Sequence, residues 1–186
     1  MAGATAGSTM CDYAITLQAP EDEQHIDPLL DLAFGQSRIS RPSYMLRAGV
    51  APIEDLCFSV KSSNGEFLAT LRFWPVSIGD EKATLLGPLA VQPSLQGQGI
   101  GKALVSHGLA RAKKLGYRLC FVVGEQFYYG PYGFKLGHPL GYDMPVPVSA
   151  DKFQVIALQD DEFSNLPKGV MQPWLGTVTS AEVKEA

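Results

Sequence analysis

The residues best suited to bind a ligand lie in one glycine-rich segment, Gln96-Gly97-Gln98-Gly99-Ile100-Gly101-Lys102. An apolar run over residues 83 to 91 precedes this segment and predicts a buried strand, and a helical pattern follows it as far as about Leu115. Glycine allows backbone N–H groups to approach a ligand closely, and the dipole of the following helix adds positive potential at its N-terminus. The expected chemistry is therefore anion binding, with phosphate as the obvious ligand.

The spacing of these glycines excludes two common phosphate-binding loops. The nucleotide P-loop requires a glycine, four residues and then Gly-Lys-Ser/Thr. Here Ala103 follows Gly101-Lys102, and Gln96 stands where the first glycine belongs. The dinucleotide fingerprint requires G-x-G-x-x-G directly after its strand. In this chain Lys102 occupies the third glycine position, and the predicted strand ends several residues too early.

The composition is typical of one globular domain. The 186 residues are 46% hydrophobic and 18% charged, which is enough apolar content for a single core. The formal net charge is −4 and the basic residues form no cluster, so we expect no nucleic-acid partner. No apolar run reaches the length of a membrane span, and the N-terminus lacks the features of a signal peptide. We therefore expect a cytoplasmic protein without membrane contact.

The side chains that usually bind metals are scattered along the chain. Cys11, Cys57 and Cys120 lie far apart, and two of them fall in apolar strand patterns, so buried reduced thiols are expected. There is no CxxC, no HExxH and no clustered set of histidines and aspartates. No metal site is therefore predicted.

The residues before the glycine-rich segment predict a strand, two helices and a hairpin. Residues 1–11 are expected to be disordered, because their small side chains bury too little surface to offset the entropy of ordering. The elements expected next are an edge strand at 13–17, a helix from Pro20 to Gly35 broken or kinked at Pro28, a short helix at 42–47, and a hairpin of strands at 56–60 and 67–74 in which Asn64-Gly65 favours a type I′ turn.

The central strand and the segments after it predict a helical crossover. Gly87-Pro88 indicates a bulge inside the central strand, because proline has no N–H to donate. The helix from 100 to 115 carries Gly108 and Ala112 on one face, which favours close packing on the sheet. The remaining segments are a strand at 118–123 parallel to the central strand, a proline-rich irregular loop at 138–147, a last strand at 152–158 and an acidic turn at 159–162.

Three motifs occur in a familiar order: Gly87-Pro88-Leu89-Ala90-Val91, then the pattern Gln-x-x-Gly-x-Gly, then Tyr128-Tyr129-Gly130-Pro131-Tyr132-Gly133-Phe134. Together they resemble the GNAT superfamily of acyl-CoA-dependent N-acyltransferases, and most closely its YhbS-like branch. The resemblance implies an α+β fold, an α/β/α sandwich around a mixed, mostly antiparallel sheet with two splayed parallel strands. It places the acyltransferase domain at residues 12–160, and we expect the tail at 161–186 to pack on the same domain.

The resemblance also implies acetyl-CoA as co-substrate, without a metal. In this family the pantetheine arm bonds to the backbone of the central strand, here at Leu89, Ala90 and Val91. The bulge in that strand turns backbone groups toward the acyl thioester. The pyrophosphate contacts fall on Gln96, Gly97, Gln98, Gly99, Ile100, Gly101 and Lys102. Many relatives carry an asparagine before the tyrosine motif, and this chain has none between Cys120 and Phe134, so one pantetheine contact is left open.

The resemblance places the general acid at Tyr129, five residues before the phenylalanine of the Gly-Phe pair. Its hydroxyl would donate a proton to the leaving thiolate. Tyr128 and Tyr132 lie on the same short turn, and a packing cluster of aromatic rings is the alternative interpretation.

The general base is less well determined by the sequence. Many relatives use a glutamate from the central strands, but none occurs between Ala83 and Val91. Glu125 is the best-placed carboxylate, followed by Glu54 and Glu81, and each of these can instead be a surface charge. His107, in the helix after the glycine-rich segment, is interpreted as a structural histidine.

The two N-terminal helices border the acceptor site in this family. The possible acceptor contacts are Arg38, Arg41, Tyr44 and Arg47, with solvated helix charges as the alternative. We expect an N-acetyltransferase in which an amine of a small molecule or of a protein attacks acetyl-CoA directly. A catalytically idle acyl-CoA-binding sensor or regulatory module of the same fold is the competing hypothesis. Dimers are common in such families, so a homodimer is a further expectation.

Overall fold

The computed structural model describes residues 12–159 and 163–175. The strands are β1 (Tyr13–Leu17), β2 (Phe58–Ser62), β3 (Phe67–Ile78), β4 (Glu81–Val91), β5 (Leu119–Val123), β6 (Lys135–Leu136), β7 (Tyr142–Asp143), β8 (Phe153–Ala157), β9 (Gly169–Val170) and β10 (Gln172–Pro173). The α-helices are α1 (Glu23–Phe34), α2 (Pro42–Met45), α3 (Ile100–Lys114) and α4 (Gln126–Tyr129). Short 3₁₀ helices cover Pro20–Asp22, Gln36–Ser40, Glu54–Leu56, Pro93–Leu95, Gly130–Tyr132, His138–Leu140 and Phe163–Asn165.

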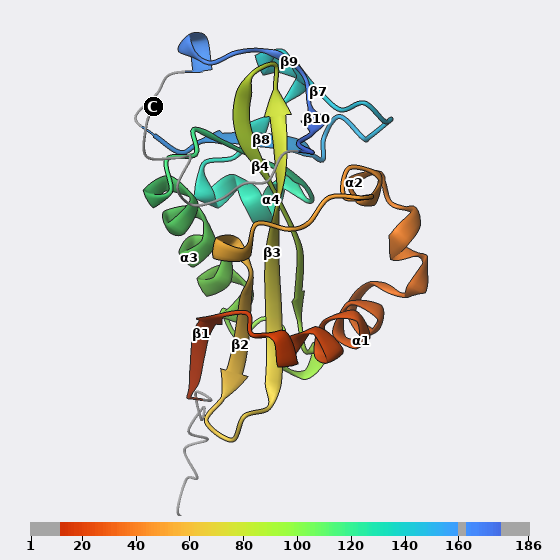
Figure 1. The fold of residues 1–186 in the computed structure, drawn as a ribbon, viewed down its shortest axis with the longest axis vertical. Helices are drawn as coiled ribbons and strands as arrows, with labels where there is room; N and C mark the ends of the chain where they lie inside the picture. The colour runs from red at the N-terminus through yellow and green to blue at the C-terminus, as the bar shows by residue number, and fades with distance from the viewer. Residues whose placement is uncertain (1–11, 160–162, 176–186) are drawn as a thin grey trace, which may run out of the picture.

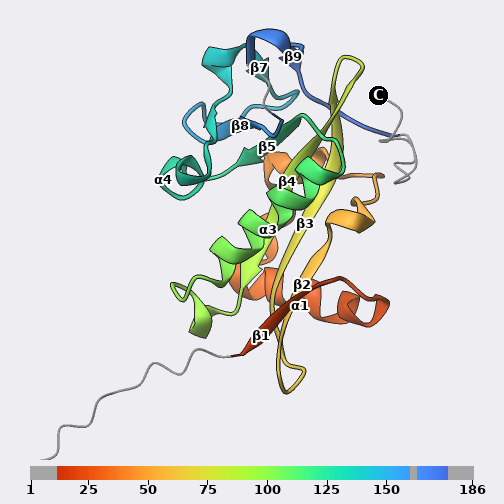
Figure 2. The same ribbon diagram turned by 90° about the vertical axis from the view of Figure 1, so that its left-hand side faces the viewer.

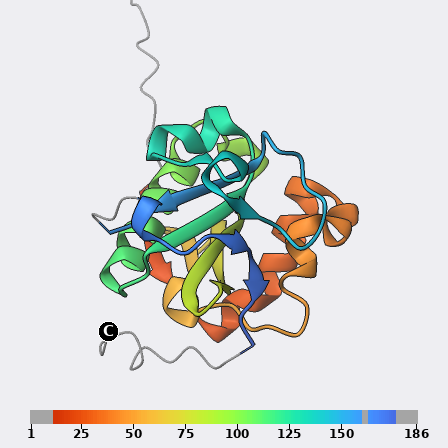
Figure 3. The same cartoon turned by 90° about the horizontal axis from the view of Figure 1, so that it is seen from above.

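The main sheet is mixed and mostly antiparallel. Its strand order is β1-β2-β3-β4-β5-β8-β6, and β10 pairs with the far end of β3. Only β4 and β5 run parallel within this sheet, among the residues that the structure describes. Helix α1 lies on one side of β3 and β4 and α3 lies on the other (Figures 1 and 2). Seen from above, the strands separate the red and orange helices from the green and teal ones (Figure 3). The predicted α+β sandwich is therefore confirmed.

The two parallel strands separate after a short stretch of pairing. Partners run from Thr84 with Cys120 to Leu86 with Val122, and no pairing follows, although β4 continues to Val91. The predicted splay of the parallel strands is thus present. Among the residues that the structure describes, one edge of β4 beyond Leu86 has no neighbouring strand, and this edge faces the functional region.

The predicted bulge in β4 is also present. Phe73 pairs with Leu86 and Leu71 pairs with Leu89, so Gly87 and Pro88 together oppose Arg72 on β3. Gly87 has a φ of 118°, which a residue with a side chain rarely adopts. The peptide bond between Gly87 and Pro88 is cis. The bulge therefore lies where β4 and β5 separate.

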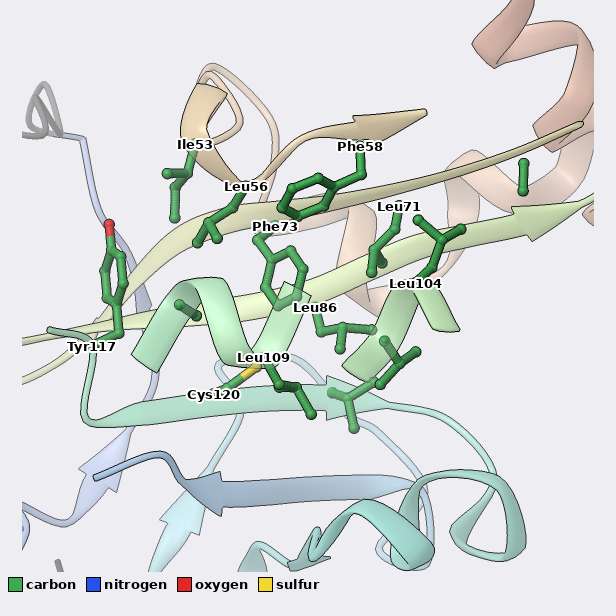
Figure 4. Packing of buried hydrophobic residues seen from close by; sticks show 14 of the residues in the cluster. Ile53, Leu56, Phe58, Leu71, Phe73, Leu86, Leu104, Leu109, Tyr117 and Cys120 are labelled. Carbon is green, nitrogen blue, oxygen red and sulfur yellow. The ribbon is translucent and has the colours of Figure 1, made fainter. Parts of the chain in front are cut away.

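Helix α3 lies close to the sheet because small residues face β3. Gly108 is buried, and a Cβ atom on it would lie 2.6 Å from Cε2 of Phe73. Leu104 and Ala112, one turn away on either side, are fully buried in the same core cluster. Figure 4 shows Leu104 and Leu109 of α3 together with Phe73 and Leu71. The prediction from the small residues of this helix is confirmed.

Helix α1 packs on the other face of the sheet. Ile26, Leu29 and Leu30 are buried with Phe67 and Ala90. The sequence predicted a break or kink at Pro28. The break is absent, because α1 runs from Glu23 through Pro28 to Phe34 as one helix. Proline has no backbone N–H, so one helical hydrogen bond is missing at this position. The loss is tolerated because the buried apolar face on both sides of Pro28 holds the helix on the sheet.

Three other local predictions were wrong. Asn64 has a negative φ and Gly65 alone is left-handed, so the β2–β3 turn is not type I′. The amide of Gly65 bonds to Ser62, and a register shift in the hairpin takes up the extra residue. The loop at 138–147 contains a 3₁₀ helix and β7. The strand β8 is not the last, because β9 and β10 follow it and pair with β7 and β3.

Three of the expectations fall wholly or partly outside the described residues, namely disorder at 1–11, an acidic turn at 159–162 and packing of the tail at 161–186 on the domain. Cys57 and Cys120 are buried free thiols, as expected, and Cys11 lies outside the described part. Residues 163–175 contact the domain through buried Leu166 and Met171.

Replacing Gly108 by alanine tests the close packing of α3. In an exposed helix this change gains about 1 kcal/mol of stability. Here the new Cβ would overlap the Phe73 ring, so we expect the free energy of unfolding to fall by about 1–3 kcal/mol. Urea denaturation measures the change. Gly130→Ala is the control, because its Cβ would meet nothing closer than 3.9 Å, and a stabilised Gly108→Ala protein would contradict the packing described here.

Candidate functional site

The glycine loop, residues 96–102, presents free backbone donors at the start of α3. Gly97 and Gly99 have φ angles of 80° and 90°, and no atom lies within 4 Å of a Cβ built on either. In the part of the chain that the structure describes, the N–H groups of Gly97, Gly99 and residues 100–102 donate to no other group. Unpaired amides at a helix N-terminus, reinforced by the helix dipole, form an anion site.

A cavity of about 360 Å³, here called the loop cavity, lies between this loop, β4 and the end of α1. Nine of the ten residues predicted to bind the cofactor line it, namely Leu89, Ala90, Val91, Gln96, Gly97, Gly99, Ile100, Gly101 and Lys102. Gln98 does not line the cavity, because its side chain turns back and donates to the carbonyl of Ser94. Ala33, Phe34, Leu95 and Tyr128 complete the wall. For the first three, the sequence analysis found no signal beyond ordinary apolar packing.

A second and larger space, here called the bulge cavity, has a volume of about 750 Å³. It lies against the bulge in β4, the turn that carries Tyr128, Tyr129 and Tyr132 (here called the tyrosine turn), the segment around α2, residues 147–149 and Lys152. Phe34, Leu89 and Tyr128 line both cavities, so the two spaces meet along β4. The opening between β4 and β5 thus connects the anion site with a wider chamber.

Tyr128 stands at the junction of the two cavities. Its hydroxyl oxygen would lie 2.7 Å from a Cβ on Gly101, so any side chain at position 101 would collide with it. Burial, together with the neighbouring Tyr132, raises the pKa of Tyr128 to about 12. The sequence analysis considered Tyr128 only as a neighbour of Tyr129. The position of Tyr128 between the cavities depends on how the turn folds back on α3.

Tyr129 is the most enclosed tyrosine of this turn. Its ring packs on the backbone of Gly124, where a Cβ would lie 2.3 Å from Cε2 of the ring. The rings of Tyr128 and Phe134 lie 4.9 and 5.7 Å away. Burial raises the pKa of Tyr129 well above its usual value, and the nearby tyrosines add to the shift. Tyr129 lines the bulge cavity as a protonated hydroxyl that can donate a hydrogen bond.

Glu125 lies beside Tyr129 on the rim of the bulge cavity. Its Oε1 atom is 2.7 Å from Nζ of Lys152, and both side chains are about half exposed. The other two carboxylates that the sequence suggested lie elsewhere. Glu81 bonds to Arg118 at the start of β4, and Glu54 lies in a 3₁₀ helix outside both cavities. Glu125 is thus the one of these three carboxylates that the structure brings to the site.

The four acceptor candidates near α2 divide into two groups. Arg41, Tyr44 and Arg47 line the bulge cavity. Arg38 does not line it, because its guanidinium bonds to Asp27, Asp31 and the Tyr44 hydroxyl. Two contributions were missed by the sequence analysis, Lys152 and the residues 148–149 of the preceding loop. They reach the site only because β8 lies beside β5.

The described residues contain no group of three His, Cys, Asp or Glu side chains that could hold a metal ion. In the same part of the chain, every helix is too short or too polar to cross a membrane. The arrangement offers a phosphate-sized anion site, an open strand edge, a protonated tyrosine and a carboxylate along one continuous space. Such a set suits transfer of a group carried on a phosphorylated, extended co-substrate.

Comparison with known proteins gives consistent matches. A sequence model of the acetyltransferase (GNAT) family matches residues 26–128. The uncharacterized N-acetyltransferase YhbS of Escherichia coli strain K12 is 30% identical over 160 residues, which cover 82% of this chain and 91% of that protein. The solved structure of Escherichia coli YhbS in complex with CoA superimposes with a TM-score of 0.76 at 26% identity, covering 88% of this chain and 91% of YhbS. A GNAT family acetyltransferase of Brucella melitensis in complex with acetyl-CoA gives 0.62 at 27% identity, with coverages of 87% and 95%.

Because the hydroxyl of Tyr129 is enclosed, we expect the free energy of unfolding to decline at alkaline pH. A tyrosine in the unfolded chain ionises near pH 10, whereas Tyr129 in the folded chain keeps its proton to higher pH. Its contribution to stability is complete below about pH 10 and declines above it, by about 1.36 kcal/mol per pH unit. We expect Tyr129→Phe to lack this part of the decline.

Urea denaturation at several pH values between 8 and about 11 measures the slope. Gly108→Ala serves as the control, because it lowers stability without removing a titrating group and leaves the slope as in the wild type. Equal slopes for Tyr129→Phe and the wild type would show that this hydroxyl is not shielded from solvent.

Proposed function

The chain belongs to the GNAT family of acetyltransferases, and we propose that it transfers an acetyl group from acetyl-CoA to an amine that attacks the thioester directly. The observation that carries this proposal is the junction of the loop cavity and the bulge cavity at Leu89 and Tyr128. A co-substrate with a diphosphate at one end and a reactive acyl group at the other fits a space with an anion site at one end and a chamber at the other.

The glycine loop fits the diphosphate of coenzyme A. Its free amides and the exposed ammonium group of Lys102 supply donors and positive charge. The absence of a side chain at Gly101 keeps the space below Tyr128 open. The CoA-bound YhbS structure and the acetyl-CoA-bound Brucella structure support this assignment by similarity.

The open edge of β4 suits the pantetheine arm. Beyond Leu86 this edge has no partner strand in the described part of the chain, and Leu89 and Val91 line the loop cavity. Buried backbone groups without a partner cost free energy, so an extended ligand with amide groups can replace the missing strand. The acetyl group would then lie against the bulge at Gly87 and Pro88, in the bulge cavity.

The reaction forms a carbon–nitrogen bond and breaks the carbon–sulfur bond of the thioester. A lysine-like amine has a pKa of about 10.4, so obtaining its neutral form at pH 7 costs about 4–5 kcal/mol. We assign acceptance of this proton to Glu125, directly or through water, because it lies on the same cavity as Tyr129.

The departing sulfur requires a proton as well. A thiol has a pKa of about 8.5, so its thiolate leaves more easily than the amine loses its proton. Tyr129 keeps its proton at neutral pH because burial raises its pKa, and it lines the chamber where the sulfur would emerge. It therefore donates to the thiolate, while holding both reactants in one space supplies several kcal/mol through proximity.

The role of the glycine loop is tested by Gly97→Val. Valine at a φ of 80° strains the backbone by about 1–2 kcal/mol and turns the loop amides away from the anion. We expect acetyl-CoA affinity to fall by about tenfold or more, as measured by calorimetry. Gly65→Val is the matched control, since Gly65 has a φ of 83° and equally open surroundings but lies in the β2–β3 turn. Equal acetyl-CoA affinity of Gly97→Val and the wild type would show that the diphosphate does not bind to this loop.

The role of Tyr129 is tested by Tyr129→Phe, which removes only the hydroxyl. We expect turnover to fall by about a hundredfold while acetyl-CoA affinity stays nearly unchanged. Release of the coenzyme A thiol measures turnover, and calorimetry measures affinity.

Tyr132→Phe is the control, because Tyr132 lies on the same turn but lines neither cavity. Unchanged turnover of Tyr129→Phe would show that Tyr129 is not the general acid. Acetyl-CoA binding without turnover on any amine would favour an idle binding module instead.

A further inference from the structure

Arg47 is a buried guanidinium group without a charged partner. Only 8% of the residue is exposed, and its Nε and Nη1 atoms are buried without a hydrogen-bond partner among the described residues. Its close neighbours are the rings of Tyr44 and Trp74, at 4.5 and 5.5 Å from the guanidinium carbon. Buried arginines are normally paired, because the charge has lost its hydration.

Arg38 provides an internal comparison. It is buried to the same degree, with 7% exposed. Its guanidinium group, however, bonds to Asp31 at 2.8 Å and to Asp27 at 2.7 Å. The fold therefore supplies two carboxylates to one buried arginine and none to the other, nine residues later. The difference points to a partner for Arg47 that is not part of the chain.

The surroundings of Arg47 indicate where that partner binds. Arg47 lines the bulge cavity, and its Nη2 atom lies 3.3 Å from the position of a Cβ on Gly87. In the proposed function, the acetyl thioester lies against the bulge at Gly87. The guanidinium group thus lies next to the point of attack.

The charges that line this cavity are predominantly positive. Arg41 and Arg47 have no carboxylate partner among the described residues, whereas Lys152 and Glu125 neutralise each other at 2.7 Å. The chain as a whole carries a net charge of −4. Burial lowers the pKa of Arg47 to about 10, so the group is still protonated at neutral pH. The cavity therefore has a positive potential on an otherwise acidic protein.

We propose that Arg47 binds an anionic group carried by the acceptor, so that the acceptors of this enzyme are amines with a carboxylate or phosphate. This inference rests on the proposed function and names its substrate class. A guanidinium group donates charge-assisted hydrogen bonds to such oxygens, which are stronger in an enclosed site. A purely cationic acceptor such as a polyamine would meet like charges. The same positive charge lowers the pKa of the attacking amine, which makes its neutral form easier to obtain.

The experiment compares amines in matched pairs that differ by the anionic group. Phenylalanine is paired with phenethylamine, β-alanine with propylamine, and O-phosphoethanolamine with ethanolamine. Thiol release at saturating acetyl-CoA gives kcat/KM for each. We expect the wild type to prefer the anionic member of at least one pair by about tenfold or more. The carboxylate and phosphate pairs distinguish the two anions.

Arg47→Met is expected to abolish this preference, mainly by raising KM for the anionic amine, and Arg47→Lys to retain part of it. Without ligand, Arg47→Met should raise the melting temperature by a few degrees, because it removes an unpaired buried charge. If Arg47 had only a structural role, Arg47→Met would instead lower the melting temperature. Arg38→Met is the matched control, which should lower the melting temperature and leave the preference unchanged.

A second measurement does not depend on turnover. The anion 3-phenylpropanoate, which has no amine, should raise the melting temperature of the wild type and not that of Arg47→Met. Equal kcat/KM within every pair, or a preference that survives Arg47→Met, would overturn the inference while the proposed function stands. If none of the six amines releases thiol, the proposed function fails for these acceptors, and the response to 3-phenylpropanoate alone decides whether Arg47 is an anion site.

Discussion

The separation of β4 from β5 beyond Leu86 is the constraint on which the site depends. Two residues of β4, Gly87 and Pro88, oppose one residue of β3, so the strand changes direction while staying paired with β3. On the other side, β5 ends at Val123 and the chain turns at Gly124 into α4. Both departures require glycine, since Gly87 has a positive φ and a side chain at Gly124 would collide with Tyr129. A continuous parallel ladder here would close the space in which the two cavities meet.

Around this opening, the fold arranges charge so that the ends of the site differ. Backbone amides and a helix dipole create positive potential at the glycine loop without a buried side-chain charge. At the bulge cavity, by contrast, the positive charge comes from buried Arg47, whose pKa is lowered to about 10 by burial. Groups that the chain leaves unsatisfied are common at functional sites. The carboxylates of Asp27 and Asp31 are bound to Arg38 and are not available to the cavity.

Much of the fold and the family could be predicted from local patterns. Three motifs between Gly87 and Phe134 were sufficient to identify the family, because each has a backbone requirement that only glycine or proline meets. The small face of α3 and the bulge in β4 were predicted for the same reason. Local rules failed where tertiary packing outweighs them. Helix α1 continues through Pro28, and Asn64-Gly65 adopts a turn other than the one its dipeptide favours, because neighbouring register and packing set the geometry.

The sequence by itself determined the glycine loop, the helical crossover that makes its flanking strands parallel and the tyrosine turn, since these depend on neighbours in the chain. Only the tertiary structure decided which side chains meet in the bulge cavity. Arg38 and Arg47 look alike in the sequence, yet one is paired and the other faces the chamber. Likewise, Lys152 reaches Glu125 only because β8 lies beside β5. Charge pairing and burial depend on long-range contacts, so no local pattern distinguishes an arginine that is paired with carboxylates from one that is not.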